Sequence, residues 1–323
     1  MRVWLSGATG YIGRAVCTRL RAAGHDVVAI VRPGTPASAR PAGDGVEIIE
    51  AALTDRVDAV RALAGTRADA VVSCIASRTG VAADARAVDL EANRHLLDAA
   101  RAAQVEVFVL LSAICVQRPR LAFQRMKLAF EAELQASGLR YSIVRPTAFF
   151  KSLAGQVERI RSGKPYLAFG SGSLTACKPI SEADLAAYLV ACLDDPERHG
   201  RILPIGGPGP ALTPLEQGRL MAAAAGVEFR MRSVPLRIFD LAEGLCAPLG
   251  RLSSRMAERA ELARIGRYYA TESMLLWDEA HLRYDAEATP ETGADTLEAF
   301  YRRVLEEGLA GQALGAAKVF RSI

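Results

Sequence analysis

Three glycines close to the amino terminus have the spacing of a phosphate-binding loop. They lie in Gly7-Ala8-Thr9-Gly10-Tyr11-Ile12-Gly13, between an apolar run at Val3–Ser6 and a helical pattern at Tyr11–Ala23. In such a loop one glycine permits the tight turn, another lets the backbone approach the phosphates, and the third lets helix and strand pack closely. The helix N-terminus adds N–H donors and a favourable dipole. The segment predicts binding of a nicotinamide dinucleotide through Gly7, Thr9, Gly10, Tyr11, Ile12 and Gly13.

The end of the next expected strand indicates which nicotinamide cofactor is bound. NAD-specific enzymes place an acidic residue there, which hydrogen-bonds the adenosine ribose. This chain has Arg32 instead, followed by Pro33, and a cation suits the additional 2′-phosphate of NADP. Arg14, just inside the first helix, is a second candidate for that phosphate. We expect Asp55 near the adenine, and we expect the other side of the cofactor to be lined by Cys74, Ile75 and Ala76.

Short apolar runs alternate with helical patterns through the first half of the chain, which is typical of a parallel sheet covered on both faces. Strands are expected at Val3–Ser6, Val27–Val31, Val46–Glu50, Ala70–Ala76, Val107–Ser112 and Tyr141–Val144. Helices are expected at Tyr11–Ala23, Val57–Ala64, Asp84–Ala103 and Phe123–Ser137. The pattern predicts an α/β fold, a doubly wound parallel (Rossmann) sheet with a smaller C-terminal substrate lobe.

The order of elements changes after Pro146. Helical patterns near Phe149–Arg161, Glu182–Leu193, Pro214–Ala225, Leu236–Arg264 and Thr296–Glu307 are separated by short strand-like pieces at Tyr166–Phe169 and Arg201–Ile205. We therefore expect residues 1–146 to form the NAD(P)-binding domain and residues 147–323 to form a mixed α/β substrate-binding lobe. The segment Pro33–Asp44, rich in Pro, Gly, Ala and Ser, is expected to be a mobile loop near the adenosine end of the cofactor.

Composition argues against several classes of protein. The chain has 323 residues and a net charge of +4, and its 40 basic and 36 acidic residues are interspersed, so we expect no nucleic-acid partner. The six cysteines and four histidines have no metal-ligand spacing, so no metal is expected. We see no targeting peptide and no apolar run long enough to span a bilayer, and we expect a cytoplasmic protein, bacterial if the chain is complete. Membrane contact is at most peripheral: Leu236–Leu249 either touches a membrane or caps the pocket, and capping is favoured.

A serine, a phenylalanine and a lysine occupy positions that carry catalysis in a known superfamily. Ser112 ends an expected strand, and Phe123 and Lys127 follow on the next expected helix. With the spacing G-x-x-G-x-x-G, this arrangement resembles the atypical short-chain dehydrogenase/reductase superfamily, which carries a Ser and a Tyr-x-x-x-Lys there. The resemblance implies that Lys127 holds the nicotinamide ribose hydroxyls. The tyrosine position is Phe123, and a phenyl ring has no proton to donate, so ordinary ketone reduction is not expected.

Two interpretations follow from the phenylalanine. The chain resembles either a catalytically silent NADP-binding redox sensor of the NmrA-like branch, or an enzyme that reduces a conjugated C=C bond without a tyrosine. The stretch Arg145-Pro146-Thr147-Ala148-Phe149-Phe150 resembles both the NmrA-like and the isoflavone-reductase-like branches, and it equally fits a strand ended by proline before a core aromatic pair. Pro146 is expected among the residues that contact the cofactor.

Stretches outside the cofactor motifs resemble one family in particular. They are Leu111–Gln117, Tyr141–Ser152, Cys177–Glu182, Ile202–Gly209 and Tyr268–Met274, followed by Thr289–Gly293 and Asp295–Leu297. The family is the iron–sulfur-free, NADPH-dependent 8-vinyl reductases of divinyl chlorophyllide, and the cysteines show no cluster-like spacing. The resemblance implies NADPH-dependent reduction of the 8-vinyl group of divinyl chlorophyllide, or protochlorophyllide, to ethyl in (bacterio)chlorophyll biosynthesis. The sensor and an isoflavone-reductase-like C=C reductase are the alternatives.

Vinyl reduction requires different groups from ketone reduction. Hydride added to the outer vinyl carbon leaves a negative charge that delocalises into the macrocycle, so no oxyanion acid is required, and a proton then reaches the inner carbon. Lys127 and Tyr141 are candidate proton donors, and Ser112 is a candidate relay. Phe123 is either an apolar wall for the tetrapyrrole or a packing residue of the helix.

Residues that follow the last expected strand of the first half are candidates for holding the pigment. We expect Phe149 and Phe150 to contact the macrocycle, and Lys151 or Lys178 to pair with its propionate. A histidine bound axially to the pigment magnesium is not favoured. The sequence leaves the oligomeric state open.

Overall fold

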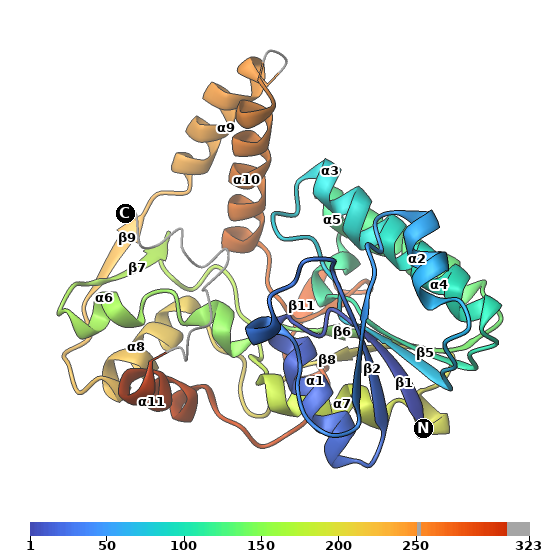
Figure 1. Cartoon of the computed structure of the whole chain (residues 1–323). Coiled ribbons are helices and arrows are strands. Elements are labelled where there is room, and N and C mark those ends of the chain that lie inside the picture. The colour runs from blue at the N-terminus through green and yellow to red at the C-terminus, as the bar shows by residue number, and fades with distance from the viewer. Residues whose placement is uncertain (251–252, 309–323) are drawn as a thin grey trace. The chain divides into compact units, whose positions relative to one another are not determined.

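The computed structural model describes residues 1–250 and 253–308, and it divides into two compact units (Figure 1). The first unit consists of Met1–Pro146 together with Glu182–Pro204. The second consists of Thr147–Ser181 and the chain from Ile205 onward. Each unit contains a cluster of buried apolar side chains formed by its own residues.

A seven-stranded sheet forms the centre of the described first unit, in the order β3-β2-β1-β4-β5-β6-β8. Every described pair from β3 across to β6 is parallel. The strands are β1 (Arg2–Ser6), β2 (Asp26–Val31), β3 (Val46–Glu50), β4 (Ala70–Ser73), β5 (Val107–Leu111), β6 (Arg140–Pro146) and β8 (Arg201–Ile205). β4 and β5 are buried throughout, which is why these strands have continuous apolar sequences rather than alternating ones.

Helices cover this sheet on both sides (Figure 1). They are α1 (Tyr11–Ala22), α2 (Arg56–Leu63), α3 (Ala82–Ala85), α4 (Asn93–Ala102), α5 (Ala122–Gln135) and α7 (Glu182–Ala191). α1 packs against α7, whereas α2, α4 and α5 share a core cluster with Trp4, Val71 and Phe108 of the sheet. The expected doubly wound α/β fold is confirmed.

One stretch of the expected helix Asp84–Ala103 departs from α-helical geometry. The structure has the short helix α3, then a π-helix η2 (Arg86–Ala92), and then α4. A π-helix widens the turn by one residue, and such segments occur frequently at functional sites. Shorter 3₁₀ turns are η1 (Ala37–Ala39), η3 (Ile114–Gln117) and η5 (Pro196–Arg198).

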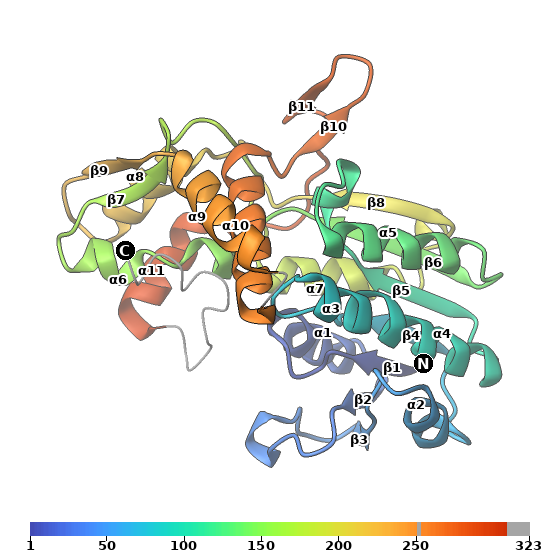
Figure 2. The same cartoon turned by 90° about the horizontal axis from the view of Figure 1, so that it is seen from above.

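The second unit contains two small sheets and five α-helices among its described residues. β7 (Tyr166–Phe169) pairs in parallel with β9 (Met231–Val234), and β10 (Leu276–Asp278) pairs antiparallel with β11 (Arg283–Asp285). The helical elements are η4 (Phe150–Leu153), α6 (Val157–Arg161), α8 (Pro214–Ala224), α9 (Arg237–Leu249), α10 (Ser254–Thr271) and α11 (Leu297–Glu307). α9 and α10 lie side by side as a hairpin (Figure 2).

The division between the units differs from two contiguous domains. The expected domains and the observed units share a boundary after Pro146. In the structure, however, Glu182–Pro204 belongs to the first unit. The reason is structural: α7 packs on α1, and β8 adds an edge strand next to β6. The helical pattern of Glu182–Leu193 showed a helix but not the face of the sheet on which it lies.

No helix in the described ranges has both the length and the apolar character needed to cross a membrane.

Candidate cofactor and active site

The glycine loop has a backbone that other residues would obstruct. Gly7 has a φ of +75°, and a Cβ there would lie 2.6 Å from the carbonyl oxygen of Cys74. A Cβ on Gly13 would lie 2.1 Å from the carbonyl oxygen of Gly7. Gly10 donates its N–H to Gly7 at 2.9 Å and is the N-cap of α1, so the first N–H groups of that helix face the loop. This geometry fits a bound pyrophosphate.

The sheet order places this loop at a topological switch point. From β1 the chain continues to β2 and β3 on one side and then to β4, β5 and β6 on the other. Ligands of doubly wound sheets bind beyond the carboxyl ends of the strands at such a point. The carbonyl of Cys74, which directly follows β4, closely approaches Gly7, and contact of Cys74, Ile75 and Ala76 with the cofactor stays a prediction. Burial raises the pKa of the Cys74 thiol to about 12, so it remains protonated.

A pocket of about 390 Å³ lies beyond the end of β2. Its lining comprises Thr9, Arg32, Pro33, Gly34, Thr35, Pro36, Ala39 and Arg78. Both arginine residues are exposed, and no described residue forms a hydrogen bond or ion pair with either guanidinium group. Two guanidinium groups that line one pocket without a described protein partner are suited to bind a doubly charged phosphate. Arg78 was not anticipated, because it follows a different strand and lies 46 positions beyond Arg32 in the chain.

The other predicted residues of the adenosine end have bonding partners. Arg14 donates to the carbonyl oxygens of Thr9 and Ala39, at 3.1 and 2.8 Å, and so ties η1 to the glycine loop. Asp55 is the N-cap of α2 and accepts from the N–H of Asp58 at 3.0 Å. Both contacts organise the protein itself, so contact of Arg14 with the phosphate and of Asp55 with the adenine stays a prediction.

The segment Pro33–Asp44 is held by polar contacts at several points. Arg40 bonds Glu50 of β3 at 2.5 Å, and Glu50 also accepts from the N–H of Gly34 at 3.2 Å. These two hydrogen bonds, with the backbone donor contributing most, hold the pKa of the Glu50 carboxyl below its usual range. The wall of the pocket is therefore tied to the sheet beside it.

Lys127 lies on α5 and forms an ion pair that the sequence did not indicate. Its Nζ is 2.9 Å from Oδ1 of Asp89, whose side chain is completely buried in η2. The same oxygen accepts from the N–H of Ser77, a few residues beyond β4, at 3.3 Å. The Lys127–Asp89 pair therefore lies at the carboxyl end of β4. One signal was present in the sequence: Asp89 and Asn93 interrupt the apolar stripe that Leu96 continues.

A chain of buried hydroxyl and amide groups leads from the sheet to this helix. Ser6 of β1 donates to Ser73 of β4 at 3.1 Å, and Ser73 donates to Asn93 at 2.7 Å. The amide nitrogen of Asn93 donates back to the carbonyl oxygen of Asp89 at 3.1 Å. Because buried polar groups are costly when unpaired, this chain specifies how η2 sits on the sheet.

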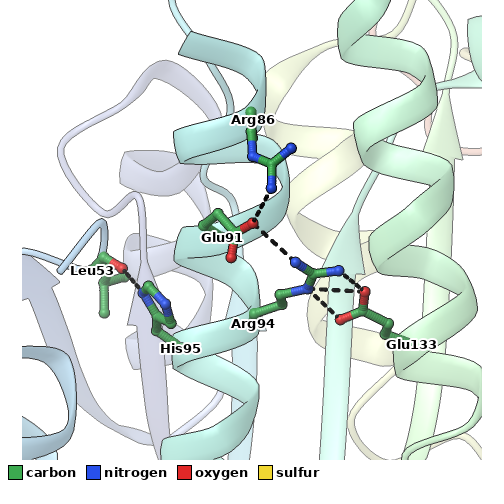
Figure 3. Close-up of polar contacts among 6 residues, drawn as sticks. All are labelled: Leu53, Arg86, Glu91, Arg94, His95 and Glu133. Carbon is green, nitrogen blue, oxygen red and sulfur yellow. Dashed lines mark hydrogen bonds and ion pairs between the residues drawn. The ribbon is translucent and has the colours of Figure 1, made fainter. Parts of the chain in front are cut away.

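The outer face of the same helix is fastened to its neighbours (Figure 3). Nε of Arg94 lies 2.9 and 2.7 Å from the two carboxylate oxygens of Glu133 on α5, and Arg94 also bonds Glu91 at 2.9 Å. His95 contacts the carbonyl oxygen of Leu53 at 2.8 Å. Glu133 lies six positions beyond Lys127 on α5, so this fork keeps the helix that carries Asp89 beside the helix that carries Lys127.

Ser112 belongs to a second buried network on α5. Its hydroxyl donates to Glu131, which also accepts two hydrogen bonds from Arg145 of β6. The Glu131 side chain is 1% exposed and that of Arg145 is 15% exposed. Phe123, Lys127 and Glu131 follow one another at intervals of four on α5, so they lie along one face of it. Since the Ser112 hydrogen is engaged, its role as a relay stays a prediction.

Two further predicted residues lie in apolar surroundings. Phe123 is 8% exposed, in the first turn of α5. Tyr141 is the second residue of β6 and packs against the core cluster, at the amino end of a strand whose carboxyl end is next to Ser112. Donation of a proton by Tyr141 and the wall role of Phe123 stay predictions. Pro146 is buried at the end of β6.

The predicted pigment-binding residues all belong to the second unit. Phe150 is 2% exposed and packs on Phe300, with ring centroids 5.5 Å apart. Lys178 is buried and bonds Glu291 at 2.9 Å, and this contact holds the pKa of the Glu291 carboxyl below its usual range. A propionate would have to compete with Glu291 for that lysine. Phe149 and Lys151 are half-buried, and pigment contact stays a prediction for all four.

Known proteins resemble this chain over nearly its whole length. A sequence model described as NAD(P)H-binding matches residues 7–196. The divinyl chlorophyllide a 8-vinyl-reductase of Oryza sativa subsp. indica is 48% identical over 98% of this chain and 82% of that protein. The reductase of the same name from Arabidopsis thaliana is 44% identical over 98% of this chain and 79% of that protein. Both names carry the word chloroplastic.

Solved structures confirm the fold independently. An NADPH-dependent quinone oxidoreductase from Escherichia coli, solved with NADPH, has a TM-score of 0.67 at 18% identity over 94% of this chain and 99% of that chain. At that identity the likeness concerns the fold, and the sequence relatives carry the family. This chain, with its glycine loop, its lysine on α5 and its phenylalanine in place of a tyrosine, belongs to the NAD(P)H-binding proteins and, among them, to the divinyl chlorophyllide a 8-vinyl-reductase family.

Proposed function

We propose that this protein is an NADPH-dependent oxidoreductase that reduces the 8-vinyl group of divinyl chlorophyllide to an ethyl group. The observation that carries the proposal is identity of 44 to 48% with reductases of that name over nearly the entire chain. The geometry supports it, because Phe123 on the face of α5 that carries Lys127 offers no phenolic proton. A C=C bond conjugated to a macrocycle requires no such proton at an oxygen.

The choice of NADPH over NADH is supported by the pocket beyond β2. Arg32 and Arg78 line it without an acidic partner among the described residues, and no carboxylate occupies the position that would accept from a ribose hydroxyl. An additional phosphate gains two charge-assisted contacts there, whereas NADH leaves two cations without a counter-charge.

The residues of the chain have three tasks in this reaction. When bound, the cofactor supplies the hydride. The glycine loop and the two arginines hold the cofactor, and Lys127 orients its ribose. The ammonium group of Lys127 is also a candidate donor of the proton to the inner vinyl carbon, because Nζ is a charged N–H donor at the carboxyl end of the sheet.

The test uses purified protein, NADPH and divinyl chlorophyllide, with the Soret band followed by absorbance. We expect the band to move to the blue with one NADPH oxidised per pigment, and NADH to support much slower turnover. A parallel assay with divinyl protochlorophyllide shows which pigment is preferred. No shift would refute the proposal. NADPH binding without turnover would then favour a redox sensor, and turnover only of a phenolic C=C substrate would favour an isoflavone-reductase-like enzyme.

A cytoplasmic location in a bacterium is part of the same proposal, and it is supported only by the sequence. Cell fractionation with an antibody to the native protein tests it: recovery in the soluble fraction at low ionic strength is expected, and recovery with membranes that resists a salt wash would contradict it.

A further inference from the structure

Asp89 is a buried acid with an unsatisfied oxygen. Its side chain has no exposed surface, and its Oδ2 has no hydrogen-bond partner in the described structure. Only one other buried side-chain atom in the described ranges, Nε1 of Trp4, lacks a partner. An unpaired buried carboxylate oxygen is costly, so each such atom calls for a specific explanation, of which a role in a functional site is one.

A short series of contacts connects this acid to the glycine loop. Gly7 approaches the carbonyl of Cys74 so closely that no Cβ fits between them. Three residues later, the N–H of Ser77 bonds Oδ1 of Asp89 at 3.3 Å, and the same Oδ1 holds Nζ of Lys127 at 2.9 Å. Asp89 and Lys127 thus lie on the β4 side of the loop, whereas Arg32 follows β2, on the opposite side of β1.

The position of the acid is set by contacts on both faces of its helix. On the inner face, Asn93 links Asp89 to Ser73 of the sheet. On the outer face, Arg94 donates hydrogen bonds to both carboxylate oxygens of Glu133 on α5 (Figure 3). The π-helical turn of η2 contains Asp89 and ends directly before Asn93. A carboxylate held this firmly restricts a flexible lysine to one position.

We propose that Asp89 is a positioning residue of the reductase: it holds the ammonium group of Lys127 at the nicotinamide-ribose half of the cofactor site. The proposal rests on the proposed function in one respect, namely that the ligand is NADPH. It assigns the two ends of the cofactor to two groups of residues. Arg32 and Arg78 serve the phosphorylated adenosine, and the Asp89–Lys127 pair serves the nicotinamide riboside.

The experiment compares two ligands on the same variants. NADPH contains both halves, whereas 2′,5′-ADP contains the adenosine and its 2′-phosphate but lacks the nicotinamide riboside. We expect Asp89→Asn to raise the Kd for NADPH about 10-fold or more, as for loss of a hydrogen bond to a charged group, with the Kd for 2′,5′-ADP unchanged. Lys127→Met should have the same effect, and the double variant should be no worse than either single one.

The controls separate positioning from a general loss of structure. Glu106→Gln makes the same acid-to-amide change in an exposed ion pair with Arg140, at the amino end of β5, and should leave both affinities unchanged. Asp89→Glu keeps the charge and should restore part of the NADPH affinity. Melting temperatures are measured for every variant by circular dichroism.

Each outcome is decisive. If Asp89→Asn weakens binding of NADPH and of 2′,5′-ADP equally, or weakens neither, the positioning role is overturned. If that variant does not fold, Asp89→Glu and Lys127→Met provide the test. An equal rise in the Kd for NADPH and for 2′,5′-ADP in either variant overturns the proposal. Failure of the wild-type protein to bind NADPH would instead refute the proposed function, so the two failures are distinguishable.

Discussion

At the scale of single residues, the pocket beyond β2 is distinguished by two arginines that have no partner among the described residues. Arg32 and Arg78 meet at one pocket, and neither is neutralised by a described carboxylate. Nearby Arg40 has the same chemistry but is bound to Glu50, and Arg14 is bound to backbone carbonyl oxygens. A guanidinium group that has no protein acceptor gains the most from a phosphate, so partnership, and not only position, distinguishes the two pocket arginines.

Removal of either pocket arginine should weaken the binding of NADPH but not that of NADH. Arg78→Ala and Arg32→Ala should each raise the Kd for NADPH about 10- to 100-fold, because each removes one charge-assisted contact. Fluorescence titration with both cofactors measures this. Arg140→Ala, which removes an exposed arginine paired with Glu106, is the matched control and should bind NADPH normally. An equal effect of Arg78→Ala on NADH and NADPH would contradict the assignment of Arg78 to the phosphate.

Gly13 should not tolerate even a methyl group. A Cβ at this position would lie 2.1 Å from the carbonyl oxygen of Gly7, so Gly13→Ala must displace the backbone of the loop. We expect a loss of about 1 to 3 kcal/mol in the free energy of unfolding, with loss of cofactor binding. Gly244→Ala in α9 has no atom within 4 Å of the added Cβ, so it should be neutral or stabilising. Urea unfolding of both variants tests the contrast, and normal NADPH binding by Gly13→Ala would disprove the steric argument.

At the scale of elements, α5 carries the residues that link the chemistry to the sheet. Its inner face presents Phe123, Lys127 and Glu131 in successive turns. Lys127 pairs with η2, and Glu131 bonds both Ser112, which directly follows β5, and Arg145 of β6. Because the carboxylates of both ion pairs, Asp89 of η2 and Glu131 of α5, are buried, a shift of α5 would leave charges unpaired. The helix is therefore fixed in register relative to three other elements.

Loss of Arg145 should reveal how strongly α5 is fixed. Arg145→Met leaves the Glu131 carboxylate buried with one donor, and we expect a loss of about 3 to 5 kcal/mol in the free energy of unfolding. Arg140→Met breaks the exposed ion pair between Arg140 and Glu106, and it should lower the free energy of unfolding by about 0 to 1 kcal/mol. Urea denaturation followed by circular dichroism compares them. Equal losses in the two variants would mean that the Glu131–Arg145 pair does not hold α5.

At the scale of the whole molecule, each of the two described units contains a cysteine whose thiol pKa is raised by desolvation. Burial raises the pKa of Cys74 in the first unit and of Cys177 in the second to about 12. Thiols ionise near pH 9 when the chain is unfolded, whereas these two remain protonated in the fold. The unfolded state therefore binds fewer protons than the folded state between these values, and stability falls as pH rises through that window.

Alkaline pH should consequently destabilise both units, and the two thiols should account for part of the loss. Between about pH 9 and pH 12 each of these two thiols contributes a decrease of about 1.4 kcal/mol per pH unit. Urea midpoints at pH 8 and pH 10.5 measure the slope. In a Cys74→Ala/Cys177→Ala variant the decrease should be shallower, with a lower starting stability. An identical slope in the variant would show that these thiols do not titrate on unfolding.

The features that could be read from the sequence are those set by nearby residues. The spacing of Gly7, Gly10 and Gly13 indicated the cofactor loop, because the steric demand acts within one turn of the chain. Apolar runs and helical periodicity indicated the doubly wound sheet for the same reason. Lys127 and Phe123 were singled out by resemblance to a superfamily motif, which places them at a fixed spacing on the helix after a strand.

The features that needed the fold are contacts between residues distant along the chain. Asp89 meets Lys127 across 38 positions, and Arg78 joins Arg32 only because their loops follow strands on either side of β1. The return of Glu182–Pro204 to the first unit likewise depends on which edge of the sheet is free, next to β6. Local patterns carry no information on strand order, and strand order decides which distant charges come together.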